Sequence, residues 1–157
     1  MNPHMAYYRI GDEATMAKTV TEYDTYAWAG ITGDFYGVHI NEEHAKKTQF
    51  GTRIVHGSLL VGFIGTLMGH MAAKAPAPGA VSYRYDMTFR APVFFGDTIT
   101  SRLELTERRD EKNECIFVAI CTNQNGKVVA SGKAILKVLN PEKKRRNEGL
   151  KSLKGEE

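Results

Sequence analysis

An aspartate and a histidine with the chemistry of a water activator lie five positions apart in a glycine-containing loop. Asp34 and His39 fall in the segment that starts at Gly33 and includes Gly37. Glycines let such a loop fold so that a carboxylate and an imidazole face one point, where they can hold a water molecule and take a proton from it. This spacing also recurs by chance, so a structural aspartate beside a surface histidine is the competing interpretation of the pair alone.

A second group suited to chemistry lies at Gly57 and Ser58, where an apolar segment begins. The first N–H groups of a helix have no partner inside it, and together with the helix dipole they stabilise negative charge on an oxygen atom. The sequence therefore predicts an oxyanion site close to the water activator. It contains no G-x-S-x-G nucleophile and no phosphate-binding loop.

The other histidines are given less specific roles. His56 directly precedes the oxyanion glycine and is a candidate third catalytic group. We favour the alternative for His56, a hydrogen-bonded structural histidine at the entry to the helix. His4, His44 and His70 show no partner pattern, and we expect them at the surface or at helix ends.

The element that must position these groups is a long apolar helix, predicted from Gly57 to Ala73. One face of it carries only small residues, namely Ser58, Gly62, Gly65 and Gly69. Because a glycine inside a helix costs about 1 kcal/mol relative to alanine, this stripe needs a compensating contact. Two interpretations remain open: a close approach of the sheet backbone, or space for a slender apolar ligand.

Shorter elements are expected before this helix. Residues 6–10 and 15–20 have the pattern of short strands or extended arms. Thr21 is suited to cap a short helix, which we expect to run through Trp28 and to end at Gly30.

The C-terminal half has the pattern of an antiparallel sheet. Hydrophobic alternation with a period of two predicts four strands, at about 81–90, 99–107, 114–122 and 127–139. Asn125-Gly126 indicates a hairpin between the last two. A long apolar helix needs cover on most sides, and a curved antiparallel sheet wrapped around it is the simplest solution. The fold class is therefore predicted as α+β.

Length and charge limit the classes of protein that fit. The chain has 157 residues, which favours one domain, at 1–140, followed by a charged tail at 141–157. The formal net charge is +3, and the tail holds six basic against four acidic residues. The body is thus nearly neutral, which argues against a partner that is a nucleic acid.

Two features favour a cytoplasmic location. Cys115 and Cys121 fall in one predicted strand at a separation of roughly 20 Å, too far for a mutual disulfide, so we expect both to be reduced and half-buried. The N-terminus lacks the pattern of a signal peptide. The apolar run from Leu59 to Met68 is too short and too interrupted by glycine to span a membrane, so no membrane partner is expected.

Several motifs together resemble those of the MaoC-like, (R)-specific enoyl-CoA hydratases. The first two are Gly33-Asp34-x4-His39 and Phe50-Gly51-x-Arg53-Ile54-Val55-His56-Gly57-x-Leu59. Further landmarks are Phe89-Arg90-Ala91-Pro92-Val93 with Gly96-Asp97-Thr98, and Thr122-Asn123-Gln124-x-Gly126. The similarity covers about Tyr7 to Val138, and as a combination it is specific.

The resemblance implies a hot-dog fold, a homodimer or an assembly of dimers, and a pocket at the subunit interface. It also implies syn addition of water to a trans-2-enoyl-CoA, giving an (R)-3-hydroxyacyl-CoA, or the reverse dehydration. Asp34 and His39 would orient and deprotonate the water that attacks C3, and the N–H of Gly57 would receive the enolate-like thioester oxygen. No metal and no redox cofactor are implied, because CoA is the carrier part of the acyl-CoA substrate.

The chain departs from the family pattern at two places. The usual Asn-Pro between the aspartate and the histidine is replaced by a loop with Tyr36 and Gly37. A serine that many members carry on the central helix is Gly65 here. Both changes bear on acyl preference, and the first bears on how rigid the loop is.

Two other functions fit the same residues. A hot-dog acyl-CoA thioesterase would direct the water at the thioester carbonyl, although the Val55-His56-Gly57 landmark speaks against it. A non-catalytic acyl-CoA-binding protein would have lost the positioning of the water. Arg53, Arg84 and Arg90 are candidates for contacts with CoA phosphates, and the sequence selects none of them.

Overall fold

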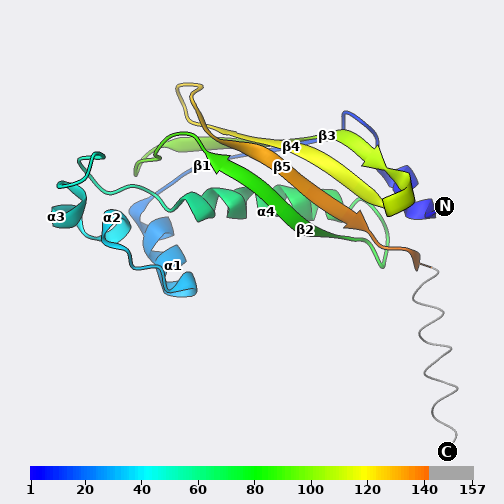
Figure 1. Cartoon of the computed structure of the whole chain (residues 1–157), viewed down its shortest axis with the longest axis horizontal. Helices are drawn as coiled ribbons and strands as arrows, with labels where there is room; N and C mark the ends of the chain where they lie inside the picture. Colours follow the sequence, from blue (N-terminus) through cyan, green and yellow to red (C-terminus); the bar gives the residue numbers. More distant parts are fainter. Residues whose placement is uncertain (142–157) are drawn as a thin grey trace, which may run out of the picture.

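A five-stranded antiparallel sheet curves over one long helix in a computed structural model that describes residues 1–141 (Figure 1). The charged tail predicted from the sequence lies, from residue 142 onward, outside these residues. The helices are α1 (Glu22–Thr32), α2 (Gly37–Ile40), α3 (Glu42–Ala45) and α4 (Gly57–Ala72). The strands are β1 (Glu13–Thr19), β2 (Ala80–Phe89), β3 (Thr98–Arg109), β4 (Glu114–Thr122) and β5 (Val128–Val138). The predicted α+β class is confirmed.

Helix α4 forms the centre of the core, as the sequence predicted. Its buried residues face the concave side of the sheet and are Leu59, Leu60, Phe63, Ile64, Leu67, Met68 and Met71. They pack against fully buried strand residues such as Leu103, Leu105 and Phe117. Burial of large apolar side chains contributes about 1.5–3 kcal/mol each, so this contact is the main force that holds helix and sheet together.

The strand order in the sheet is β1-β3-β4-β5-β2. Strand β4 lies at the centre, which explains why its sequence is apolar on both faces. Strand β2 does not pair with β3, the next strand in the chain; it pairs with β5 instead and leaves one edge of the sheet open. The sequence does not reveal this crossing, because strand patterning gives faces but not neighbours.

The three short helices gather at the N-terminal end of α4 (Figure 1). The predicted capping box at Thr21 is present, since its hydroxyl and the Asp24 carboxylate each bond the other residue's backbone N–H. The predicted end of α1 at Gly30 is wrong. The helix continues to Thr32, and Gly33 closes it in the left-handed conformation with φ of 80°.

Two other expectations, for residues 6–10 and for the cysteines, are wrong. Residues 6–10 are not a strand, because a 3₁₀ helix spans Pro3–Tyr7 and begins with proline, which suits a helix start. His4, expected at the surface or at a helix end, is buried in the first turn of this 3₁₀ helix. Cys115 and Cys121 are fully buried rather than half-buried, and both are free thiols.

The small-residue stripe of α4 meets side chains, not the sheet backbone. A Cβ added at Gly62 would lie 3.5 Å from the Trp28 ring, and one at Gly65 would lie 3.6 Å from the Tyr85 hydroxyl. The Trp28 indole N–H also donates to Ser58 Oγ over 2.9 Å. A Cβ would make an ordinary contact at both positions and would meet nothing within 4 Å at Gly69, so no close approach requires glycine in the stripe. Within residues 1–141, no helix is both long and apolar enough to cross a membrane.

Candidate active site

The predicted water activator forms at the junction of α1, α2 and α4. Gly33 ends α1 and turns the chain, so that Asp34 comes directly after it, while His39 belongs to α2. Ligand atoms of Asp34, His39 and His56 all lie within 4.8 Å of one another. The structure thus brings the two predicted residues together and adds a third. Their catalytic roles remain predictions.

The His39 ring is oriented by a backbone carbonyl. Its Nδ1 lies 2.8 Å from the oxygen of Ile54. Because a carbonyl oxygen only accepts, Nδ1 must carry the proton and Nε2 keeps its lone pair. Burial lowers the pKa of His39, and His56 acts in the same direction, against the bond to Ile54 and the charge of Asp34. A neutral imidazole with a free Nε2 is the form needed in a general base.

The Asp34 side chain is half exposed, at 48% of its full accessibility, and local bonds fix it. Its Oδ1 accepts the backbone N–H of Tyr36 at 3.2 Å, a turn that holds the carboxylate over its own loop. The backbone N–H of Asp34 in turn donates to Thr32 Oγ1 at 3.3 Å. The second carboxylate oxygen, Oδ2, lies 3.7 Å from His56 Nε2.

Gly57 is the first residue of α4, and its side of the helix opens to a pocket that His39 also lines. The backbone N–H of Gly57 has no acceptor among the hydrogen bonds of residues 1–141. A Cβ at this position would come within 3.0 Å of the Phe89 ring, so a larger residue would displace that ring. The free amide at the start of a helix is the property predicted for an oxyanion site.

The pocket has a volume of about 320 Å³ and is mainly apolar. Its lining residues are His39, Phe50, Ile54, Val55, Gly57, Leu60, Phe89, Arg90, Ala91, Pro92 and Val93. Among these residues only His39 and Arg90 have polar side chains. This combination suits a ligand that is apolar along its length and polar at one point.

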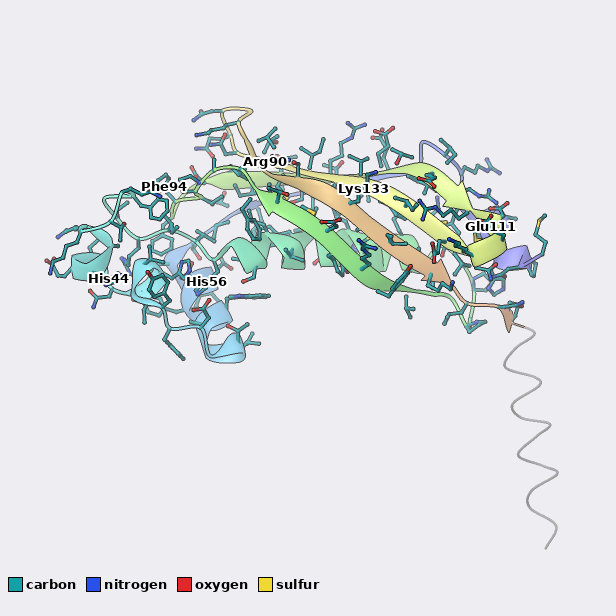
Figure 2. The ribbon with its side chains drawn as sticks, in the orientation of Figure 1. His44, His56, Arg90, Phe94, Glu111 and Lys133 are labelled. Atoms are coloured by element: carbon teal, nitrogen blue, oxygen red, sulfur yellow. The ribbon has the colours of Figure 1, made fainter. Side chains whose placement is uncertain are left out.

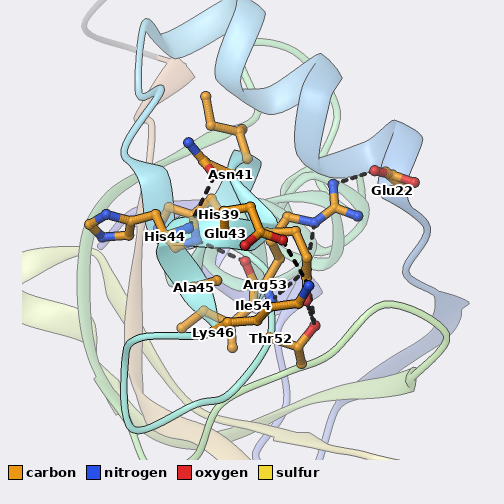
Figure 3. Close-up of polar contacts among 12 residues, drawn as sticks. Glu22, His39, Asn41, Glu43, His44, Ala45, Lys46, Thr52, Arg53 and Ile54 are labelled. Carbon is orange, nitrogen blue, oxygen red and sulfur yellow. Dashed lines mark hydrogen bonds and ion pairs between the residues drawn. The ribbon is translucent and has the colours of Figure 1, made fainter.

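An ion-pair network anchors the segment that presents the Ile54 carbonyl (Figure 3). Arg53 Nε donates to Glu42 at 3.1 Å, and its Nη1 donates to both Glu22 and the Tyr26 hydroxyl. The hydrogen bond to Glu22, joined by that to Glu42, raises the pKa of Arg53. Arg53, the residue before Ile54, therefore ties this segment to α1 and α3. Arg90 keeps one bond, to Ser131 at 3.1 Å, and lies at the pocket.

His56 matches the structural role expected for it but does more than the sequence indicated. It is 1% exposed, precedes α4, and its Nε2 lies 3.0 Å from the Asp34 carbonyl oxygen. Its ring stacks on that of His39, with centroids 3.9 Å apart and planes at 29°. Figure 2 shows it on the inner side of the short helices, whereas His44 lies on their outer side. Sequence spacing alone could not place His56 between the two predicted residues.

In the loop that departs from the family pattern, the His44 side chain of α3 occupies the space beside Tyr36 and Gly37. The Tyr36 ring meets His39 and His44 edge to face, at centroid distances of 6.1 and 5.6 Å. A Cβ at Gly37 would lie 2.9 Å from the His44 ring. Glycine at this position therefore makes room for an imidazole that packs behind the loop, so the loop is supported by aromatic contacts.

The Asp34, His39 and His56 cluster has residue types that also occur in metal sites. His56 Nε2, the nitrogen nearest the carboxylate, bears the proton that it donates to the Asp34 carbonyl. It therefore has no lone pair to offer a metal there unless that hydrogen bond breaks. The cluster fits proton transfer better than metal binding.

Comparison with known proteins identifies the family. The family described as MaoC like domain matches residues 10–125, most of the chain. The chain belongs to the MaoC-like family. An (R)-specific enoyl-CoA hydratase of Rhodospirillum rubrum is 41% identical over 82% of this chain and 86% of its own length. A 3-hydroxybutyryl-CoA dehydratase of Methylorubrum extorquens is 34% identical over 82% and 80%.

A solved MaoC-like structure agrees with the fold. The (R)-hydratase of Aeromonas caviae superposes with a TM-score of 0.74 at 28% identity, covering 84% of this chain and 98% of its own. The sheet wrapped around α4 is therefore a hot-dog fold, as the resemblance implied.

Proposed function

We propose that this protein hydrates a trans-2-enoyl-CoA to an (R)-3-hydroxyacyl-CoA, or catalyses the reverse dehydration. The observation that carries this proposal is that a ligand atom of the Asp34 carboxylate lies within 4.8 Å of one of the His39 ring, while His39 and Gly57, whose amide is unbonded, line one apolar pocket. The relatives named above act on such substrates, and this chain matches them along most of its length.

The proposed reaction uses His39 as the base. Its Nε2 takes one proton from a water molecule that Asp34 orients, and the water oxygen bonds to C3 of the enoyl group. The π electrons shift toward the thioester, whose oxygen accepts the Gly57 N–H while it carries negative charge. A proton from the Asp34/His39 centre then bonds to C2, so that one water has been added across the double bond.

The acyl chain would occupy the apolar part of the pocket. Ile54, Leu60 and Val93 line it, and Phe89 closes it beside Gly57. The CoA part of the bound substrate would extend out of the pocket beside Arg90, the lining residue with a positive charge. The site needs no redox cofactor for this reaction, since no electrons are exchanged with a carrier.

We further propose that the working unit is a homodimer or an assembly of dimers. The open edge strand β2 exposes Val81, Tyr83, Tyr85 and Phe89. An unpaired strand edge with aromatic side chains is stable in water when a second strand or chain covers it. A single domain and a cytoplasmic location complete the proposal.

The direct test is an assay of the purified protein with crotonyl-CoA. Hydration removes the ultraviolet absorbance of the enoyl thioester, and chiral analysis of the product should give the (R) alcohol. Release of free CoA thiol without an alcohol product would indicate a thioesterase. Tight binding without turnover at every chain length would indicate a binding protein. Size-exclusion chromatography with light scattering would give the oligomeric state.

A further inference from the structure

His56 is linked to all three parts of the site, to two through its imidazole and to the third through its backbone. Its Nε2 reaches the Asp34 backbone, its ring covers one face of His39, and its own peptide continues into Gly57. Its carbonyl oxygen also accepts the N–H of Leu59 in the first turn of α4 at 3.1 Å. These contacts make His56 the common support of the carboxylate, the base and the amide.

The hydrogen bond to Asp34 fixes the tautomer of His56. The Asp34 carbonyl oxygen only accepts, so His56 Nε2 must donate. Its Nδ1 is buried and has no hydrogen-bond partner within the described residues. An imidazolium here would bury a second N–H without an acceptor, which costs about 1–3 kcal/mol or more for a charged group. The neutral ring with the proton on Nε2 is the form that fits.

The stacking contact restrains the His39 ring. With His56 on one face, Ile54 bonded to Nδ1 and Tyr36 at the edge, the ring has one orientation, with Nε2 left for the pocket. The His56 ring lies 3.9 Å from that of His39, centroid to centroid. Burial, together with this ring, lowers the pKa of His39, which keeps the base neutral.

Few other titratable groups face this pair. Asp34 and Tyr36 approach from the loop, and His44 of α3 lies beyond Tyr36. Arg90, from the end of β2, lines the same pocket as His39. Among these groups only Asp34 brings a negative charge, and with the bond to Ile54 it favours a protonated His39, whereas burial and His56 favour the neutral ring.

We propose that His56 is a positioning residue: its Nε2–H holds the Asp34 backbone, and its ring supports His39 so that the base stays aligned beside the Gly57 amide. This inference rests on the proposed function, because it assigns His56 to the same site. It goes beyond the expected role of a structural histidine, since it predicts effects on proton transfer as well as on folding.

Two variants separate the two contacts. His56→Phe keeps an aromatic face on His39 and removes the N–H to Asp34. His56→Gln keeps an N–H donor and removes the ring. We expect kcat to fall roughly 10- to 100-fold in both, because small displacements of reacting groups are costly. His70→Gln, at the exposed end of α4, is the matched control and should behave as the wild type.

The pH dependence distinguishes positioning from a merely structural role. Burial lowers the pKa of His39, and removal of the His56 ring opens that face to water. The pKa of His39, followed by NMR of its ring protons, should therefore rise in His56→Gln and stay near the wild-type value in His56→Phe. The acid limb of the kcat/KM profile should move to higher pH in the first variant alone.

Several outcomes would overturn the inference. One is an unchanged His39 titration in His56→Gln with both variants folded; another is a loss of kcat below threefold in both. If the variants fail to fold, nitrogen NMR of the wild type still decides, since a His56 proton on Nδ1 near neutral pH contradicts the inference. A wild type that hydrates no enoyl thioester would refute the proposed function, while the NMR measurements would still test His56.

Discussion

His39 Nδ1 lies 2.8 Å from the carbonyl oxygen of Ile54, a residue 15 positions further along the chain. This bond joins α2 to the segment that leads into α4, and it sets the tautomer of the proposed base. The orientation of His39 thus depends on how that segment is held. Arg53, through Glu22 and Glu42, and the bond from Val55 N–H to Val93 hold it on both sides.

Removal of either member of the proposed pair should abolish most of the activity. His39→Ala takes away the base and Asp34→Asn the negative charge that orients water, so each should lower kcat by about 10²–10⁴-fold. Initial rates on crotonyl-CoA measure this, with circular dichroism to confirm folding and His70→Ala as a surface control. Wild-type rates in both variants would rule out this pair as the catalytic centre.

Arg53→Lys should reduce activity although the charge is kept. Lysine cannot reproduce the forked contacts that guanidinium makes with Glu22 and Glu42, so the Ile54 carbonyl should shift. We expect kcat to fall about tenfold. Arg102→Lys, in an exposed ion pair with Glu13, is the control for the same substitution. Equal rates in both variants would show that the network does not position the base.

Gly57→Ala should lose activity because its new methyl group meets the Phe89 ring. We expect a fall of about 10²–10³-fold, comparable to the loss of an oxyanion donor. Phe89→Leu in the same chain should restore part of the rate. Gly62→Ala is the control within α4, since a Cβ there makes an ordinary contact at 3.5 Å and should stabilise the helix by up to about 1 kcal/mol. If the double variant Gly57→Ala/Phe89→Leu is as slow as Gly57→Ala alone, the contact with the Phe89 ring is not the cause of the loss.

The activity should persist at a lower pH than an unperturbed histidine allows. Burial lowers the pKa of His39 below its usual value of about 6.5, so the neutral base survives further acidification. The rate should therefore fall only as pH drops through this lowered pKa. The acid limb of a kcat/KM profile against pH gives the apparent pKa of the base. An apparent pKa above the usual histidine value would contradict the assignment of His39 as that base.

Cys115 and Cys121 should not react with iodoacetamide in the folded protein. Burial raises the pKa of the Cys115 thiol to about 12 and also raises that of Cys121. Thiolates are the reactive form, so both residues should be alkylated only after unfolding in guanidinium. Mass spectrometry of native and denatured samples gives the number of alkylated cysteines in each. Rapid native modification would show that the β4 region opens readily.

Local patterns predicted most of what the structure shows near the site. The apolar run from Gly57, the capping residue Thr21 and the alternation from Val81 each specify an element through its own residues. The closeness of Asp34 to His39 followed from a short loop. These features depend on neighbours in sequence, where spacing carries information.

The features that the sequence missed depend on contacts between distant segments. The stacking of His56 on His39, the anchoring of Arg53 to α1 and the packing of Phe89 against Gly57 require the fold itself. The end of α1 was misplaced because two glycines, Gly30 and Gly33, both suit a helix end, and only Gly33 adopts the left-handed conformation.

The pairing of β2 with β5 alone has a consequence for how the protein matures on the ribosome. Strand β2 ends at Phe89, which lines the pocket, yet its partner β5 comes after every other strand of residues 1–141 in the chain. A nascent chain that ends before Val128 would carry both residues of the proposed catalytic pair. It would still lack β5, the strand that holds β2 and thereby the Phe89 side of the pocket. Catalytic activity should therefore appear late in folding, in a single step, when β5 pairs with β2.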